Sequence, residues 1–230
     1  MSTVLVVVAH PDDEVLGAGG TIAKRARAGD RVVSLALGDG VSARYDTPDR
    51  VPQEEIDQRR EHARQAGDVL GIDAWHFRDF PDNRFDSVDL LDLVKAVESV
   101  ADRVQPDVIY THHSGDLNVD HRRTHQAVMT AFRPEPGSTV NEIYSFEVLS
   151  STEWSTGGSG DSFDPNVFVD VKEVWSQKLE AMRCYADEIA TFPHPRSEEA
   201  IESLAKRRGS QAGRLRAEAF LLERRIDSSN

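Results

Sequence analysis

A histidine and three acids stand together where the first apolar segment of the chain ends. Residues 4–9 are consecutive apolar residues, and they are followed at once by the pentapeptide HPDDE at 10–14. Such a run predicts a strand buried on both faces of a parallel sheet, and ligand sites of these sheets lie at the carboxyl ends of the strands. Carboxylates packed there repel one another and lose hydration, and a bound divalent cation relieves both costs. The segment therefore predicts a metal site.

A second cluster of histidines and acids follows another apolar segment. Residues 106–111 predict a buried strand, and the positions after it contain His112, His113, Asp116, Asp120 and His121. Strand ends that are far apart in sequence can lie side by side in a parallel sheet, so the 10–14 segment can meet His121 in one pocket. Two imidazoles and a carboxylate, with a water in the open position, form a known catalytic zinc set, whereas structural zinc sites mostly use thiolates. Cys184 is the only cysteine, which excludes the thiolate kind.

The apolar segments between these clusters predict an α/β fold. Strands are expected at 4–9, 31–37, 74–77, 106–111, 142–148 and 167–171, and helices at 14–28, 53–70, 90–104, 172–186 and 197–208. The alternation of strand and helix favours a mostly parallel sheet with helices on both faces. A glycine-rich surface loop is expected at 157–161. We expect a single domain over residues 1–230, in which the segment 167–230 packs on the core.

Composition narrows the class of protein. The chain has 230 residues, a formal charge of −13 and a pI near 5.0, which argues against a nucleic-acid partner or an anionic membrane surface. The first residues lack the pattern of a signal peptide, and the first apolar segment is too short to cross a bilayer. These features predict a soluble, cytoplasmic protein without stable membrane insertion.

Other chemistries fit the sequence less well. A dinucleotide-binding fold needs a glycine pattern directly after the first strand, but the glycines at 17–20 come too late and Ile22 stands where the third glycine belongs. Neither a P-loop nor the G-x-S-x-G motif of serine hydrolases is present. A phospho-receiver domain also has acids at the end of its first strand, but it leaves His10 and the second cluster without a role.

Each of these residues has a structural explanation when it is taken alone. Asp13 and Glu14 suit the first turn of a helix, where the dipole favours acids. His112 or His113 suits a polar strand end, and the arginines at 59–60 suit an exposed helix face. The occurrence of both clusters in one chain favours the functional interpretation over these separate explanations.

These motifs resemble the LmbE-like (PIG-L) family of zinc-dependent de-N-acetylases. The resemblance is carried by HPDDE at 10–14 and by the sequence NVDH at 118–121. Weaker similarities extend over most of the chain, at Arg59 with Ala63, Ala66, Leu70 and Gly71, and at 82–86, 194–197 and 217–220. The pentapeptide is the most specific of these segments.

The resemblance implies a Rossmann-like fold and removal of an acetyl group from the amine of a GlcNAc-type sugar conjugate. By motif, His10, Asp13 and His121 would bind Zn²⁺ or another divalent metal. Asp12 would be the general base that takes a proton from the metal-bound water. Arg59, or Arg60 if the register differs by one, would contact the substrate. Because relatives often associate, a homo-oligomer is also expected.

One position departs from the family pattern. Many members have a histidine three residues before the last metal ligand, where it assists the oxyanion, and this chain has Asn118 there. An amide can donate a hydrogen bond but cannot act as an acid. His112, His113 or His194 is a candidate to replace the missing histidine. Asp120, beside a ligand histidine, is a candidate to orient that ring or a neighbouring one.

Substrate specificity is expected to come from loops. The candidate segments are 42–52, 82–86 with Asp82, and 150–165. Two alternatives to a deacetylase stay open, namely a metal-dependent hydrolase of another bond such as a phosphoester, and a non-catalytic domain that binds a metal or a small molecule. A carboxylate left free beside the metal ligands favours an enzyme.

Overall fold

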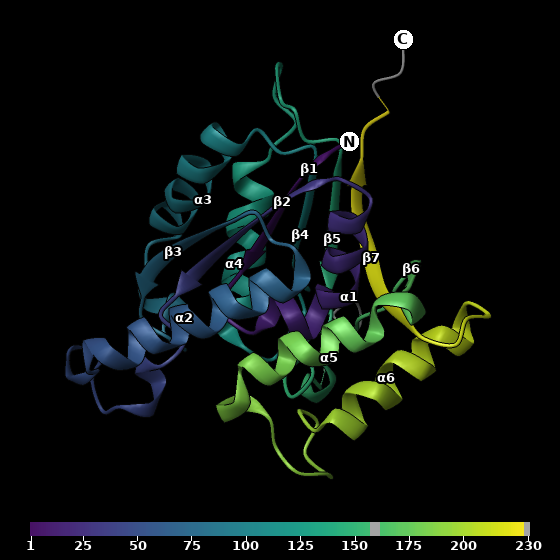
Figure 1. Cartoon of the computed structure of the whole chain (residues 1–230). Helices are drawn as coiled ribbons and strands as arrows, with labels where there is room; N and C mark the ends of the chain where they lie inside the picture. The colour runs from purple at the N-terminus through teal and green to yellow at the C-terminus, as the bar shows by residue number, and fades with distance from the viewer. Residues whose placement is uncertain (157–161, 228–230) are drawn as a thin grey trace.

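A seven-stranded sheet forms the centre of the protein, whose structure is a computed structural model that describes residues 1–156 and 162–227. The strands are β1 (Thr3–Val8), β2 (Arg31–Gly38), β3 (Ala74–Phe80), β4 (Val108–His112), β5 (Glu142–Phe146), β6 (Val167–Asp170) and β7 (Ala217–Arg225). They lie in the order β3-β2-β1-β4-β5-β7-β6 (Figure 1). Strands β1 to β5 are parallel, and β7 is antiparallel to its neighbours β5 and β6. The predicted mostly parallel sheet is confirmed.

Helices cover both faces of this sheet. They are α1 (Asp13–Arg27), α2 (Gln53–Leu70), α3 (Leu90–Val104), α4 (Val119–Ala131), α5 (Trp175–Cys184) and α6 (Glu198–Gln211). Helices α3 and α4 pack in one apolar cluster on one face, and α1, α2, α5 and α6 pack in a second cluster on the other (Figure 1). The α/β fold with helices on both faces is therefore confirmed.

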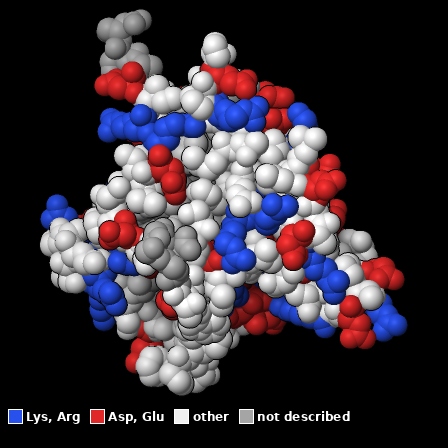
Figure 2. Space-filling view, turned by 180° about the vertical axis from the view of Figure 1, so that it is seen from behind, with Lys and Arg blue, Asp and Glu red and all other residues white. Residues whose placement is uncertain are grey.

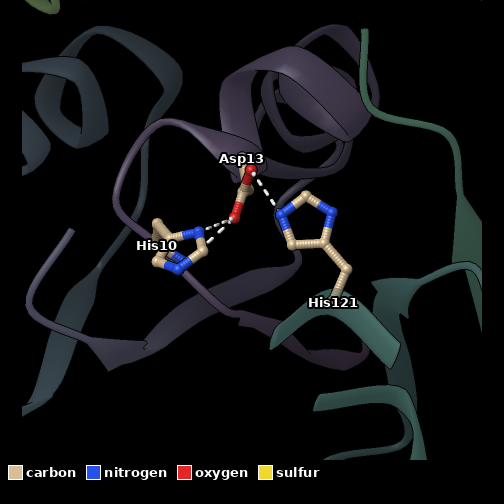
Figure 3. A group of neighbouring side chains, drawn as sticks. All are labelled: His10, Asp13 and His121. Atoms are coloured by element: carbon tan, nitrogen blue, oxygen red, sulfur yellow. Dashed lines mark hydrogen bonds and ion pairs between the residues drawn. The ribbon is translucent and has the colours of Figure 1, made fainter. Parts of the chain in front are cut away.

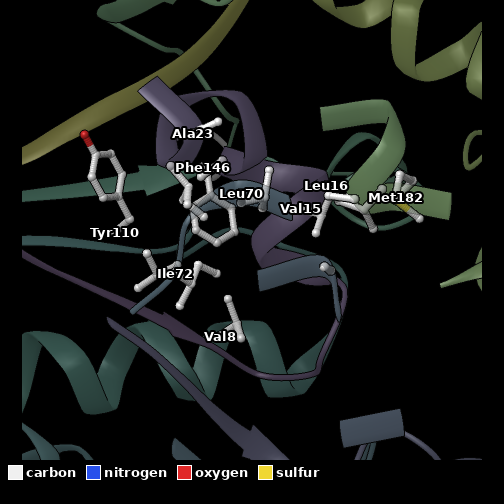
Figure 4. Close-up of a cluster of buried hydrophobic side chains, with 14 of the residues drawn as sticks. Val8, Val15, Leu16, Ala23, Leu70, Ile72, Tyr110, Phe146 and Met182 are labelled. Atoms are coloured by element: carbon white, nitrogen blue, oxygen red, sulfur yellow. The ribbon is translucent and has the colours of Figure 1, made fainter. Parts of the chain in front are cut away.

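Strand β1 lies in the interior because its side chains are apolar on both sides. Val4, Val6 and Val8 belong to the cluster of the α1 side, of which Figure 4 labels Val8 and Phe146. Leu5 and Val7 belong to the cluster of the α3 and α4 side. Alternation along a strand sends successive side chains to opposite faces, so an unbroken apolar run fits a strand covered by helices on both sides.

The point where the strand order reverses lies between β1 and β4. The chain continues from β1 to β2 on one side and returns as β4 on the other, where Val4 is paired with Val108 and Val6 with Tyr110. Open α/β sheets bind ligands outside the carboxyl ends of the strands at such a point. Both clusters predicted from the sequence leave the sheet there.

The last strand is a correction to the sequence prediction, which ended the chain with two helices. Residues 217–225 form β7, inserted between β5 and β6. Its alternation is obscured by Glu218, which is buried and accepts hydrogen bonds from Lys178 Nζ at 2.6 Å and from the backbone N–H of Thr21 at 2.7 Å. A buried charge with such partners is tolerated, but it removes the sequence signal of an interior strand. The loop expected at 157–161 lies outside the described residues.

Charges of both signs are interspersed over the surface. Figure 2 shows Lys and Arg beside Asp and Glu over the face seen from behind Figure 1. Surface pairs such as Lys95 with Glu98, 2.7 Å apart, are typical of this arrangement and contribute little to stability. Within 1–156 and 162–227, the structure contains no helix with the length and hydrophobicity needed to cross a membrane.

Candidate active site

Two histidines face one aspartate at the carboxyl ends of β1 and β4. His10 follows β1, Asp13 is the first residue of α1, and His121 lies in the first turn of α4. His10 Nδ1 is 3.5 Å from Asp13 Oδ2, and His121 Nε2 is 3.4 Å from Asp13 Oδ1 (Figure 3). Asp13 Oδ1 therefore faces the imidazole of His121, although His121 is more than a hundred positions away. Asp13 Oδ2 faces that of His10 and also that of His112, whose Nε2 is 3.4 Å away.

These three side chains fit a zinc ion. Tetrahedral zinc with bonds of about 2.0–2.1 Å separates its ligand atoms by roughly 3.4 Å, close to the spacings found here. Asp13 Oδ1 is buried and meets the criterion for a hydrogen bond with no described residue, although His121 Nε2 lies 3.4 Å away. Coordination to a cation would satisfy this buried oxygen more fully. His10, Asp13 and His121 are thus suited to hold a metal.

The surrounding carboxylates also favour a cation. Burial alone would lower the pKa of His121. The negative charges of Asp13 and Asp116 outweigh this effect and raise the pKa to about 9. Burial likewise opposes ionisation of His10, yet Asp82 and Asp120 hold its pKa well above the ordinary value. Both imidazoles therefore lie in an excess of negative charge, where a proton or a metal cation is stabilised.

His10 is oriented by two further acids. Its Nε2 is 3.0 Å from Asp120 Oδ2 and 3.0 Å from Asp82 Oδ1. Asp120 is fixed in turn, because it accepts hydrogen bonds from the backbone N–H groups of Asn83 at 2.6 Å and Phe85 at 2.9 Å. His10, Asp82 and Asp120 also bring possible metal-ligand atoms close together. The 3.0 Å distances between His10 Nε2 and the two carboxylates are, however, those of hydrogen bonds. Such partners fix the ring orientation of a metal-binding histidine.

His121 has its own support. Its Nδ1 is 3.2 Å from Asp116 Oδ2, and Asp116 accepts hydrogen bonds from the hydroxyls of Ser151 and Thr152. The ring of His112 stacks on His121 with centroids 3.9 Å apart, and its Nε2 accepts a hydrogen bond from the backbone N–H of Ala9 at 2.9 Å. His112 therefore packs behind the triad, where it links β4 to the end of β1.

Asp12 lies beside the triad but outside it. Its φ of 122° is unusual for a residue with a side chain and is sustained by its surroundings. Arg196 Nη1 donates to Asp12 Oδ2 at 2.9 Å, and Arg59 Nη1 is 3.9 Å from the same oxygen. Burial raises the pKa of Asp12 to about 6, against the lowering effect of Arg196 and Arg59. The structure thus holds a carboxylate next to the three side chains that are suited to hold a metal.

Glu14 supports this turn. Its Oε2 accepts a hydrogen bond from the backbone N–H of Asp12 at 3.0 Å, and its Oε1 accepts one from the Tyr185 hydroxyl at 2.7 Å. Burial raises the pKa of Glu14 to about 8, in spite of these hydrogen bonds. Glu14 therefore braces the backbone of Asp12 and connects it to the C-terminal half of the chain.

A hollow of about 260 Å³ opens in front of these groups. Its polar lining includes His10, Asp12, Arg44, Arg59, Asp82, Asn118, Glu188 and Arg196. Asn118 is the N-cap of α4, and its Oδ1 accepts a hydrogen bond from the backbone N–H of Asp120 at 2.8 Å. Its oxygen is thus engaged in the cap, which leaves the amide nitrogen as the group that can serve a ligand.

Three residues predicted to contact substrate lie elsewhere. Arg60 does not line the hollow. It pairs with Asp79, and its guanidinium carbon lies 5.5 Å from the centre of the Phe77 ring. His113 follows the last residue of β4, and its ring meets that of Phe163. His194 is exposed, and its Nδ1 accepts a hydrogen bond from the backbone N–H of Arg196. None of these histidines lines the hollow beside Asn118.

The sequence prediction did not include the residues that the C-terminal half brings to the hollow. Glu188 ends the 3₁₀ turn Ala186–Glu188, and Arg196 precedes α6. The only signal was the weak similarity at 194–197, which contains Arg196 but gave it no role. Their contacts with Asp12 and Arg59 join segments far apart in sequence, and no local pattern encodes such contacts.

Comparison with known proteins assigns the chain to a family. The sequence model of the family PIG-L, described as GlcNAc-PI de-N-acetylase, matches residues 5–132. An Escherichia coli K12 protein called uncharacterized deacetylase YaiS is 31% identical over 186 residues, which are 78% of this chain and 88% of the relative. The 4-oxalmesaconate hydratase of Pseudomonas putida is 30% identical over 200 residues, 79% of this chain and 72% of the relative.

A solved structure extends the similarity to the whole chain. The crystal structure of GalB, the 4-carboxy-2-hydroxymuconate hydratase of Pseudomonas putida KT2440, superposes with a TM-score of 0.77 and 25% identity, covering 100% of this chain and 99% of that one. The family match covers more than half of the chain and includes His10, Asp13 and His121. The chain therefore belongs to the PIG-L (LmbE-like) family.

Proposed function

We propose that the protein is a zinc-dependent hydrolase that removes the N-acetyl group from a GlcNAc-type amino-sugar conjugate. The observation that carries this proposal is a carboxylate, Asp12, that lines the hollow together with His10 and is not one of the three side chains suited to a metal. Family membership supports the choice of reaction, because the family is described by a de-N-acetylase and one relative is called a deacetylase. A simple binding domain has no need of a free acid beside its metal ligands.

His10, Asp13 and His121 would hold the zinc ion. Zinc in such a site supplies Lewis-acid chemistry, polarising a carbonyl and bringing the pKa of water toward about 7. The chain's own contribution is to keep the two imidazoles in place, through Asp120 on one side and Asp116 on the other. This support fixes which nitrogen of each ring faces Asp13.

Asp12 would carry the proton transfers. It accepts the proton of the attacking water while a bond forms between the water oxygen and the amide carbon. It then delivers this proton to the nitrogen as the carbon–nitrogen bond breaks, so that acetate and a free amine leave. Its position beside the proposed metal-binding residues suits both transfers, and Arg196 and Arg59 hold its Oδ2 there.

Asn118 would take part as a hydrogen-bond donor. Its Oδ1 caps α4, so its amide nitrogen is available to a developing oxyanion in the hollow. Because a side-chain amide donates a hydrogen bond but is too weakly acidic to transfer its proton, Asn118 leaves all acid chemistry to Asp12. Arg59, which lines the same hollow, would contact the sugar conjugate.

The test is release of acetate from a panel of N-acetylglucosamine conjugates, measured together with the zinc content per chain. We expect activity in the zinc-loaded protein, loss after chelation and recovery on addition of zinc. Acetate release that is unaffected by complete removal of metal would reject the zinc-dependent reaction.

A hydratase is the second candidate, and a specific observation favours it. Two of the similarities reported above, at 30% and 25% identity, are to hydratases of Pseudomonas putida. The same acid and metal ligands could direct a water to a carbon–carbon double bond, with the proton passing to the adjacent carbon. Loss of the ultraviolet absorbance of a conjugated unsaturated dicarboxylate, without acetate release from any amide, would establish this alternative.

A further inference from the structure

The backbone of Asp12 is fixed in a conformation that residues with a side chain rarely adopt. Its φ of 122° and ψ of −28° lie outside the favoured regions, and such a conformation persists only where the surrounding structure imposes it. The carbonyl oxygen accepts hydrogen bonds from the backbone N–H groups of Val15 at 3.1 Å and Leu16 at 3.0 Å. The N–H of Asp12 donates to Glu14 Oε2 at 3.0 Å. Both backbone polar groups of Asp12 are therefore held, one by α1 and one by a side chain.

The burial of Glu14 is not explained by its place at the start of a helix. An acid in the first turn can interact with the helix dipole and still be hydrated, whereas the side chain of Glu14 is completely buried. Its two donors, the Asp12 N–H and the Tyr185 hydroxyl, are neutral groups, so they provide no ion pair to offset the loss of hydration. A buried acid at this cost suggests that the hydrogen bond to Asp12 is what it provides.

Tyr185 connects this hydrogen bond to the C-terminal half of the chain. Its side chain is completely buried at the end of α5, which packs beside α1 (Figure 1). From there its hydroxyl donates to Glu14 Oε1 at 2.7 Å. Arg196, eleven positions later, donates to Asp12 Oδ2 at 2.9 Å. The segment 185–196 therefore holds Asp12 at two points, the backbone through Glu14 and the carboxylate through Arg196.

We propose that Glu14 and Tyr185 are positioning residues, which hold the backbone of Asp12 in its strained conformation and so direct its carboxylate toward the proposed metal-binding residues. Glu14 acts as a hydrogen-bond acceptor, and Tyr185 keeps this acceptor in place. The effect on catalysis rests on the proposed function, in which Asp12 transfers protons. The effect on the backbone requires neither metal nor substrate, so it can be measured separately.

Glycine and alanine at position 12 measure the strain. Both remove the carboxylate, but only glycine adopts a φ of 122° at little steric cost. We expect the unfolding equilibrium constant of the protein as isolated, determined with urea, to be about fivefold lower for Asp12→Gly than for Asp12→Ala. In a Glu14→Met background this ratio should fall to about one or reverse, because the acceptor is lost and the backbone can relax. Equal constants for the two substitutions in the wild-type background, or a ratio that Glu14→Met leaves unchanged, would overturn the proposal.

A conservative variant separates hydrogen bonding from charge. Glu14→Gln keeps an oxygen that can accept from the Asp12 N–H, and its amide N–H can donate to the Tyr185 oxygen. The ratio of unfolding constants between glycine and alanine at position 12 should therefore stay near the wild-type ratio in the Glu14→Gln background. A change as large as that caused by Glu14→Met would overturn the role of Glu14 as an acceptor.

Tyr185→Phe tests the effect on catalysis, and Tyr144→Phe is its matched control. The Tyr144 hydroxyl donates to Glu142 Oε2 at the same distance of 2.7 Å, and neither residue of that pair lines the hollow. We expect Tyr185→Phe to lower kcat for acetate release about tenfold at unchanged KM and zinc content, because the carboxylate of Asp12 is less well aimed. Tyr144→Phe should retain the wild-type kcat. In an Asp12→Asn background Tyr185→Phe should have no further effect on kcat, since the group that it positions is absent.

The outcomes separate this inference from the proposed function. An equal loss of kcat in Tyr144→Phe, or the full loss caused by Tyr185→Phe in the Asp12→Asn background, would indicate a general structural role and overturn the inference. Acetate release that depends on Asp12, with a strain that does not depend on Glu14, rejects the inference alone. A strain that depends on Glu14, in a protein that releases no acetate from any conjugate, rejects the deacetylase and leaves the positioning of Asp12 in place.

Discussion

The two walls of the hollow differ in charge, burial and origin. The metal-ligand wall is the proposed metal site: His10 lines the hollow, and Asp13 and His121 are buried next to it among acids. The arginine wall consists of Arg44, Arg59, Arg196 and Glu188, and its members range from buried to half exposed. The first wall is fixed by adjacent strand ends and by a layer of supporting hydrogen bonds. The second is assembled from three segments and is held mainly by charge.

This difference suggests a division of labour. Rigid, dry groups suit the reaction centre, because catalysis depends on pre-organised geometry. Partly hydrated arginines suit recognition of the rest of the substrate, which varies between relatives of one fold. Substitutions on the first wall should therefore change metal content and turnover, and substitutions on the second should change substrate affinity.

The largest effect is expected at a metal ligand. His121→Ala removes one of the three metal-binding atoms, so bound zinc and acetate release should both fall to background. His194→Ala is the matched control, because His194 is exposed and lies outside the hollow. Zinc per chain, measured by elemental analysis, distinguishes them, and a full complement of zinc in His121→Ala would contradict the ligand assignment.

A smaller effect is expected at Asp120, which contacts a proposed metal ligand and not the metal itself. Asp120→Asn weakens the partner of His10 Nε2, and loss of such an orienting acid typically costs about 10- to 100-fold in metal affinity or activity. Asp102→Asn, at an exposed position on α3, serves as the control. Competition with a zinc-binding dye gives the affinity. Equal zinc affinity in the two variants would show that Asp120 does not position His10.

On the arginine wall, Arg59→Gln should raise KM by about tenfold through loss of a charged hydrogen bond, while zinc content stays at the wild-type level. Its neighbour Arg60 provides the control, since Arg60 faces away from the hollow and pairs with Asp79. Steady-state kinetics on one conjugate compares them. A larger effect of Arg60→Gln would mean that the substrate binds on the outer side of α2.

The smallest effects concern two helix caps, one near each wall. Asn118 caps α4 and Ser197 caps α6, where its hydroxyl accepts a hydrogen bond from the backbone N–H of Ala200 at 3.1 Å. Alanine at either position should lower the free energy of unfolding by about 1 kcal/mol, as measured with urea. Only Asn118→Ala should also lower kcat, because only Asn118 faces the reaction centre. An equal loss of kcat in Ser197→Ala would remove the distinction between the walls.

The metal-ligand wall was largely predictable from sequence, for physical reasons. The apolar run of β1 and the acids that follow it are local signals, and parallel pairing of β1 with β4 brings His121 to the same edge. The arginine wall was not predictable, because Glu188 and Arg196 reach Asp12 and Arg59 only through the tertiary fold. The residue that replaces the missing histidine was also beyond the sequence, and none of the candidates His112, His113 and His194 lines the hollow.

The fold shows the same pattern. Parallel strands flanked by helices follow from apolar runs and their spacing, whereas β7 was missed because buried Glu218 interrupts its apolar face. Lys178 and Thr21 satisfy that charge, and both are distant in sequence. Charges that are neutralised by distant partners thus conceal a strand in the same way that they conceal the arginine wall.

The role of Asp12 is the central claim, and Asp12→Asn tests it most directly. Zinc per chain and kcat for acetate release should be measured on the same samples of wild-type and variant protein. We expect an unchanged zinc content and a kcat lower by about 10²- to 10⁴-fold, the usual contribution of a positioned general base. Wild-type kcat in the zinc-loaded Asp12→Asn variant would contradict the account.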